Sequence, residues 1–303
     1  MPKRLLLGGL VALAALVLTG CSGGASGTST GDGRISVVTS TNVYGQIAQQ
    51  IGGDAVTVTA LIDSPSQDPH EYEATASNQL AVRSADLLVE NGGGYDTFFD
   101  SLVQASGSSA PVVVAAEHSP AWKGADHLEG FNEHVWYDPA TTAQVADAIA
   151  TQLSTLDPSR ADAFAANAQA FTTQVAGLES ALAAIATQHR GAQVFVTEPV
   201  PGYLIAAAAL DSVTPDAFSQ AVEEGHDVPP ATLLDAIGLL RAGTVKLVIV
   251  NAQAGGAETT QVVDTATAAG IPVLEFTETL PAGQTYVQWM QQNIDQIAQA
   301  LGK

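Results

Sequence analysis

The chain has one cysteine, Cys21, and only ten lysine and arginine residues against 31 aspartate and glutamate residues. A single cysteine cannot form an intramolecular disulfide, and its N-terminal position leaves the rest of the chain without a thiolate ligand. Any metal site must therefore use imidazole and oxygen ligands. The formal net charge of −21 disfavours nucleic acid as a partner, and it favours solubility and the attraction of cations.

The chain also lacks an apolar run long enough to span a membrane. Its most apolar segment, Leu5 to Leu18, is shorter than the roughly 20 residues that a spanning helix needs. It follows Lys3 and Arg4 and ends in Leu-Thr-Gly-Cys, as in the export signal of a bacterial lipoprotein. We therefore expect residues 1–20 to be a signal peptide, with cleavage before Cys21 and lipidation of its thiol. A retained short anchor is the alternative.

The expected signal peptide is followed by residues 21–33, which begin with Cys21. After Cys21 this segment is rich in glycine, serine and threonine and has no core-forming side chains, which predicts a flexible tether. The protein is then expected to be extracytoplasmic and lipid-anchored to the cell membrane. About 270 residues remain, more than a single core usually holds, so two domains are expected.

From residue 34 the pattern alternates between short apolar strands and amphipathic helices. Strands are predicted at 35–39, 55–62, 86–90, 111–115, 193–197, 245–250 and 272–276. Helices are predicted at 43–51, 78–83, 141–156, 203–210, 230–242, 257–269 and 286–301. This alternation predicts an α/β fold with parallel-rich sheets flanked by helices.

Residues 158–190 break the alternation, because apolar residues recur there at spacings of three and four without interruption. Asp157 can cap a helix there with Pro158 in its first turn, and Gly191 can end it. One long helix of roughly 50 Å is expected, a rigid spine between an N-terminal metal-binding lobe, 34–157, and a C-terminal one, 191–303. A coiled-coil hairpin arm is the alternative.

Four potential metal ligands lie in loops spread along the two predicted lobes: His70, His134, Glu198 and Glu278. Ligands bind beyond the carboxyl ends of the strands in open α/β sheets, and the predicted strands place these residues at loop ends facing one cleft. Two carboxylates in a cleft would repel one another without a cation, whereas two neutral imidazoles and two carboxylates neutralise a divalent ion. Taken singly, a lone histidine is more often an ordinary surface or core residue, and a lone glutamate at a strand end is usually solvated.

Other polar residues have weaker patterns. Asn42 and Tyr44 follow the first strand and could donate hydrogen bonds to a ligand histidine. The charged segment 223–227 is expected to be solvated. No phosphate-loop lysine follows the triple glycine at 92–94, so nucleotide binding is not expected.

Four segments resemble the cluster A-I solute-binding proteins, the metal-binding lipoproteins of bacterial ABC importers of manganese and zinc. The segments are Gln-Asp-Pro-His-Glu-Tyr-Glu at 67–73, Glu-His-Val-Trp-Tyr-Asp-Pro at 133–139, Thr-Glu-Pro at 197–199 and Thr-Glu-Thr-Leu at 277–280. The resemblance covers residues 35 to about 301, and it implies that His70, His134, Glu198 and Glu278 bind the ion.

The chain departs from the family pattern at two points. The fourth ligand of the family is most often aspartate, so Glu278 reaches one methylene further. Zinc-type members carry a histidine-rich loop between the first two ligands, whereas this chain has only His118 and His127 there, which we interpret as surface or accessory residues. The carboxylates and the missing loop favour manganese or iron over zinc as the bound metal.

The resemblance implies a monomeric, non-enzymatic lipoprotein that binds one divalent metal ion, Mn or Zn with Fe as a further option, and delivers it to the membrane permease of an ABC transporter. A binding protein for a chelated metal or an organic solute on the same scaffold is the alternative. A metallohydrolase is a third hypothesis, although the chain has no His-Glu-x-x-His motif.

Overall fold

The computed structural model describes residues 33–302, apart from residues 68, 71, 126–127 and 129. Residues 34–303 form one compact unit. The expected signal peptide, Cys21 and His127 lie outside the described residues, as does the predicted tether except for Gly33. None of the helices in the described part of the chain has the length and hydropathy that crossing a membrane requires.

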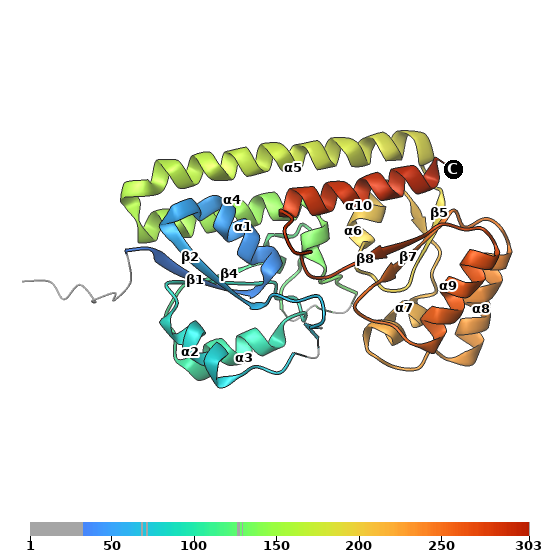
Figure 1. The fold of residues 1–303 in the computed structure, drawn as a ribbon, viewed down its shortest axis with the longest axis horizontal. Helices are drawn as coiled ribbons and strands as arrows, with labels where there is room; N and C mark the ends of the chain where they lie inside the picture. The colour runs from blue at the N-terminus through green and yellow to red at the C-terminus, as the bar shows by residue number, and fades with distance from the viewer. Residues whose placement is uncertain (1–32, 68, 71, 126–127, 129, 303) are drawn as a thin grey trace, which may run out of the picture. The chain divides into compact units, whose positions relative to one another are not determined.

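Two four-stranded parallel sheets form the frame of the molecule (Figure 1). The first has the strand order β2-β1-β3-β4 and the second the order β6-β5-β7-β8. Their strands are β1 (Ile35–Thr41), β2 (Val56–Ile62), β3 (Leu87–Glu90), β4 (Val112–Val114), β5 (Gln193–Val196), β6 (Asp211–Ser212), β7 (Leu247–Asn251) and β8 (Val273–Phe276). Both sheets have the same order of neighbours, so each lobe gathers its loops at the carboxyl edge of its strands.

Ten α-helices in the described part of the chain cover these sheets. They are α1 (Asn42–Gly52), α2 (Ala76–Ser84), α3 (Thr97–Ser106), α4 (Pro139–Leu156), α5 (Ala161–His189), α6 (Gly202–Ala207), α7 (Asp216–Glu223), α8 (Pro230–Arg241), α9 (Ala257–Ala268) and α10 (Tyr286–Leu301). Four short 3₁₀ turns are η1 (Gly53–Ala55), η2 (Ala115–His118), η3 (Val135–Tyr137) and η4 (Pro158–Arg160).

Alternate residues of each sheet enter different cores, as the two-residue period of a strand requires. In β3, Leu88 packs into a core with α2 and α3, while Leu87 and Val89 face a core with α1, α4 and α5. In β7, Val248 contributes to a core with α7, α8 and α9. Both faces of each sheet are therefore buried, which explains why the strands read as nearly continuous apolar runs.

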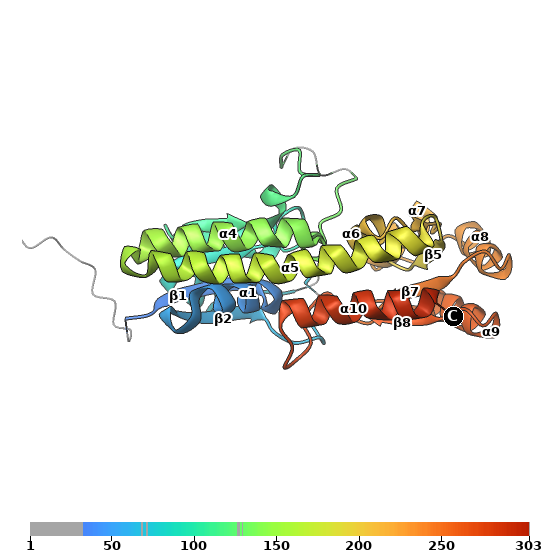
Figure 2. The same cartoon turned by 90° about the horizontal axis from the view of Figure 1, so that it is seen from above.

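The core beneath α5 and α10 is continuous between the two lobes. It contains residues of the first sheet, residues of the second sheet and the buried stripe of α5, which runs from Phe164 to Ile185. Figures 1 and 2 show α5 running over both sheets, with α10 beside it over the second sheet. Helix α5 has 29 residues and is about 43 Å long at 1.5 Å per residue.

The predicted α/β fold with two lobes and one long helix is confirmed, and the segment after residue 157 is one helix and not a hairpin arm. The α-helix begins at Ala161, later than the predicted 158. The Asp157 side chain accepts a hydrogen bond from the Ser159 N–H, and residues 158–160 form a separate 3₁₀ turn. Helices α3 and α7 and the two-residue strand β6 were not predicted.

Candidate metal centre

His134 stands at the buried end of a loop that leads into η3. Its side chain has no exposed area, and Tyr95 and Trp136 pack against it with ring centroids 5.9 and 5.1 Å away. Its Nδ1 lies 2.8 Å from Oδ1 of Asn132, which can only accept, so Nδ1 carries the hydrogen and Nε2 carries the lone pair. Nε2 is buried without a hydrogen-bond partner in the described part of the chain. This is the tautomer that a metal ligand needs.

Asn132 also joins the two lobes. Its Nδ2 donates to the carbonyl of Pro199, 2.9 Å away, directly after Glu198 in the second lobe. Its carbonyl accepts a hydrogen bond of 2.7 Å from the Tyr203 hydroxyl. The residue that orients one imidazole is thus held by the loop that carries a carboxylate of the other lobe.

His70 follows the buried Pro69 in the loop after β2, and 23% of its side chain is exposed. Its ring lies edge-on to Tyr95, with centroids 5.0 Å apart, and 6.2 Å from the ring of His134. His70 is the most exposed of the four predicted ligands. It therefore stands between the buried ligands and the solvent.

Glu198 and Glu278 come from loops after β5 and β8, the two strands that flank β7 in the second sheet, and they are 3% and 1% exposed. Nδ2 of Asn251, the last residue of β7, donates to both carboxylates, at 2.8 Å to Oε2 of Glu198 and 2.6 Å to Oε1 of Glu278. Oε2 of Glu278 lies 4.0 Å from Nε2 of His70 in the first lobe. The two acidic groups thus meet at one amide, and one of them also faces an imidazole.

The structure brings three of the four predicted ligands into one group. One ligand atom each from His70, His134 and Glu278 lies within 4.8 Å of the others. Tetrahedral ligands at about 2.1 Å from a metal lie about 3.4 Å apart, so modest side-chain shifts would close this group around an ion. Among the described residues, Glu198 is not within that group and is connected to it through Asn251.

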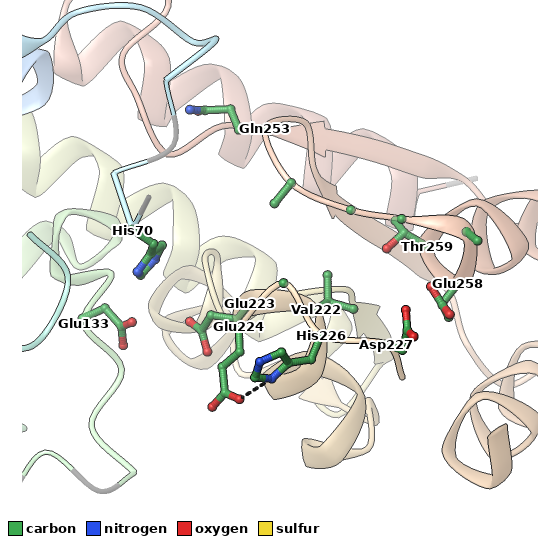
Figure 3. Close-up of a pocket in the computed structure, with 15 residues that line it drawn as sticks. His70, Glu133, Val222, Glu223, Glu224, His226, Asp227, Gln253, Glu258 and Thr259 are labelled. Carbon is green, nitrogen blue, oxygen red and sulfur yellow. Dashed lines mark hydrogen bonds and ion pairs between the residues drawn. The ribbon is translucent and has the colours of Figure 1, made fainter. Parts of the chain in front are cut away.

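A second group lies at the solvent side of His70. Ligand atoms of His70, Glu133 and Glu223 lie within 4.8 Å of one another. They line a cavity of about 740 Å³ whose wall also includes Glu224, His226 and Glu258. Figure 3 shows His70 and Glu133 on one side of this cavity and Glu223 on the other. The cavity is strongly acidic.

The surroundings shift the pKa values of the basic and acidic groups of the site in opposite directions. Burial lowers the pKa of His134 well below its usual value, and the nearby His70 lowers it further, so the imidazole is neutral at pH 7. Burial, followed by the charge of Glu133 and then of Glu198 and Glu278, raises the pKa of Glu223 to about 8. Burial also raises the pKa of Glu133. A cation at this place would relieve the mutual repulsion of these carboxylates.

Asn42 and Tyr44, the predicted hydrogen-bond donors to a ligand histidine, bond to other residues. Asn42 exchanges two hydrogen bonds of 2.9 Å with the backbone of Leu280, in the loop of Glu278. The Tyr44 hydroxyl donates to Oδ1 of Asn91. Neither set of bonds reaches an imidazole, so Asn42 supports a carboxylate-bearing loop and Tyr44 supports the first lobe.

The sequence reasoning missed the residues that orient the ligands, Asn132 and Asn251, and the aromatic wall, Tyr95. It also treated Glu223 as part of a solvated charge run, whereas Glu223 is only partly exposed and the following residues, 224–227, are exposed. Asn132 lies two residues before a predicted ligand, which is the one signal that could have identified it. Asn251 has no local signal, because its partners lie 53 and 27 residues away in the sequence.

Comparison with known proteins gives related sequences and related folds. The manganese-binding lipoprotein MntA of Halalkalibacterium halodurans is 29% identical over 179 residues, which cover 58% of this chain and 58% of that protein. MntA of Bacillus subtilis is 32% identical over 163 residues, 53% of each chain. The chain thus matches little more than half the length of these curated relatives.

The periplasmic zinc-binding protein TroA from Treponema pallidum has the same fold. Its structure matches with a TM-score of 0.74 at 22% identity, covering 89% of this chain and 99% of that one. The family model described as zinc-uptake complex component A, periplasmic (ZnuA), matches residues 37–300. With both lobes and the candidate metal centre inside that match, this chain belongs to the ZnuA family.

Proposed function

We propose that this protein is an extracytoplasmic solute-binding lipoprotein that binds one divalent metal ion between two lobes and delivers it to the permease of an ABC-type importer. The observation that carries the proposal is the convergence of ligand atoms from His70, His134 and Glu278 within 4.8 Å. Glu198, joined to Glu278 through Asn251, is the fourth proposed ligand. The family and the relatives' names support the assignment to metal uptake and not to catalysis.

The proposal includes the anchor and the domain organisation. A lipid on Cys21, after removal of residues 1–20, would attach the protein to the cell membrane through the tether 21–33. The metal-binding lobes would be 34–157 and 191–303, joined by the segment of residues 158–190 that contains α5, and the protein would act as a monomer. His118 and His127 are not part of the proposed site.

The ion would be Mn²⁺, Zn²⁺ or Fe²⁺. Two imidazoles and two carboxylates suit first-row divalent cations, and the relatives above are named for manganese or zinc. The two glutamates and the absence of a histidine-rich loop from the sequence favour manganese or iron.

One observation favours the second candidate, a binding protein for a chelated metal. The cavity beside His70, about 740 Å³, is far larger than a bare ion. Its wall is mainly acidic and polar, however, whereas sites for organic ligands are predominantly apolar and aromatic. The bare ion is therefore the better fit.

The test is elemental analysis of purified residues 34–303, followed by calorimetric titration of Mn²⁺ and of Zn²⁺ into the metal-stripped protein. We expect one ion per chain, and affinity at least about 100-fold weaker in His70→Ala and in Glu278→Ala. His189→Ala, at the far end of α5, is the matched histidine control and should bind as the parent does. Unchanged binding in both ligand variants would remove the proposed site, and binding of a chelate without the bare ion would favour the second candidate.

A further inference from the structure

Asn251 gives the two carboxylates of the second lobe a single common partner. One nitrogen, Nδ2, lies 2.8 Å from Oε2 of Glu198 and 2.6 Å from Oε1 of Glu278. A side-chain amide nitrogen carries two hydrogens, so it can donate one to each carboxylate. Hydrogen bonds to a charged acceptor are stronger than neutral ones, and these are buried.

The orientation of the Asn251 amide is fixed by its other contacts. Oδ1 accepts a hydrogen bond of 3.0 Å from the N–H of Gln253, which leaves Nδ2 to face the carboxylates. The Asn251 N–H lies 3.3 Å from Oγ1 of Thr197, next to Glu198. Asn251 is 5% exposed and ends a strand that is buried along its whole length. It is thus a rigid donor.

The opposite oxygen of Glu278 faces the first lobe. Oε1 bonds to Asn251, and Oε2 lies 4.0 Å from Nε2 of His70. In Glu198 the oxygen that bonds to the amide is Oε2. In each glutamate, Asn251 therefore holds one carboxylate oxygen and not the other.

We propose that Asn251 is a positioning residue that determines metal preference, because it restricts Glu198 and Glu278 to one coordinating oxygen each. This inference rests on the proposed function and deepens it. One nitrogen from each of the two histidines and one oxygen from each of the two glutamates give a four-coordinate site. Four is the coordination number that Zn²⁺ adopts most readily. Released from the amide, both carboxylates can bind through two oxygens, which raises the coordination number towards the six that favours Mn²⁺.

The two glutamates favour the binding of Mn²⁺, whereas Asn251 shifts the preference of the site towards Zn²⁺. The Glu278 loop has independent supports, because Gln253 Oε1 accepts the N–H groups of Glu278 and Thr279 at 2.7 and 3.0 Å. Asn42 holds the same loop through Leu280. Removal of the Asn251 amide should therefore free the carboxylates without displacing their backbone.

The experiment compares Asn251→Ala with the parent protein by calorimetric titration of Mn²⁺ and Zn²⁺ into stripped residues 34–303. We expect the dissociation constant for Mn²⁺ to fall relative to that for Zn²⁺ by about tenfold or more. X-ray absorption at the manganese edge should show more oxygen neighbours and a longer mean metal–oxygen distance in the variant. Asn251→Asp keeps the shape and the Gln253 contact, and it should shift the ratio in the same direction if Asn251→Ala does not fold.

Asn42→Ala is the matched control, because it removes an asparagine that holds the same loop only through the backbone. A purely structural effect would weaken the binding of Mn²⁺ and of Zn²⁺ to the same extent, as expected for Asn42→Ala. The ratio of the two dissociation constants would then stay unchanged. An unchanged ratio in both Asn251 variants, or an unchanged absorption spectrum, would overturn the inference while leaving the proposed function intact. Failure of the parent protein to bind either ion would instead overturn the proposed function itself.

Discussion

At the scale of single residues, Glu90 is a buried acid that is not among the candidate metal ligands. It ends β3, is 5% exposed, and its Oε2 has no hydrogen-bond partner in the described part of the chain. Burial, followed by repulsion from Asp96, Asp100 and Glu117, raises its pKa from 4.5 to about 8. Glu90 is therefore protonated in the folded protein at neutral pH and ionised in the unfolded chain.

The sign of the resulting pH dependence follows from proton linkage. Between pH 4.5 and about 8 the folded state binds more protons at Glu90 than the unfolded state does. This contribution to stability is fully present below pH 4.5 and is lost as the pH rises through about 8. Glu90→Gln, which keeps the shape and cannot ionise, should melt about 3 °C or more above the parent at pH 9 and close to it at pH 4.

Thermal unfolding of both proteins at pH 4, 7 and 9 tests this prediction. Glu117→Gln removes the same charge from an exposed neighbour and should leave most of the pH dependence in place. Parallel curves of melting temperature against pH for the parent and Glu90→Gln would contradict the assignment.

At the scale of elements, α10 connects the second lobe to the first through its first residue. The Tyr286 hydroxyl donates to the carbonyl of Trp136, 2.8 Å away, and lies 2.9 Å from Oγ1 of Thr142. The Tyr286 N–H donates to Oε1 of Gln46, and its ring centroid lies 5.8 Å from that of Phe171 in α5. Tyr286 is completely buried, so it fixes the end of α10 among residues of the first lobe.

Truncation of Tyr286 should therefore destabilise the whole protein and not one lobe. We expect Tyr286→Ala to lower the free energy of unfolding by about 3–5 kcal/mol, because it leaves a cavity in the shared core. Tyr286→Phe keeps the ring and should cost about 1–2 kcal/mol for the lost hydrogen bonds. Denaturant unfolding followed by circular dichroism and by tryptophan fluorescence should give one coincident transition. Two separate transitions would show that the lobes unfold independently.

Helices α10 and α7 differ in how well they could be predicted from the sequence. Helix α10 was predicted at its observed bounds from the helical pattern, and in the structure Thr285 and Gln288 form a capping box at its start. Helix α7 has eight residues and no side-chain cap, so its pattern was too short to identify. Its last residue is Glu223, and the missed helix therefore hid the burial of that carboxylate at the site.

The candidate site could be predicted only in part. His70, His134, Glu198 and Glu278 lie in short motifs, so residue type and strand ends indicated them. Their convergence and their orientation depend on hydrogen bonds between distant segments, such as Asn132 to Pro199, and no local pattern encodes these. For this reason the sequence indicated the four candidate ligands but not the asparagines that donate hydrogen bonds beside them.

At the scale of the whole molecule, the continuous core limits how far the lobes can move. Residues of both sheets, α5 and α10 share one buried cluster, so wide opening would expose apolar surface. We expect the radius of gyration of residues 34–303 to change by less than about 1 Å when Mn²⁺ or Zn²⁺ is added. Small-angle X-ray scattering of stripped and loaded protein measures this, with His70→Ala plus metal as the control. A larger contraction that requires His70 would indicate hinge closure.

The seating of Tyr286 among residues of the first lobe also has a consequence during synthesis. The ribosome synthesises the first sheet long before α10. Until α10 follows, the part of the first lobe that Tyr286 covers is exposed. That interior cannot close until Tyr286 itself has emerged and can pack against the first lobe. A chaperone or export factor that shields the early segment would therefore have its greatest effect before α10 emerges.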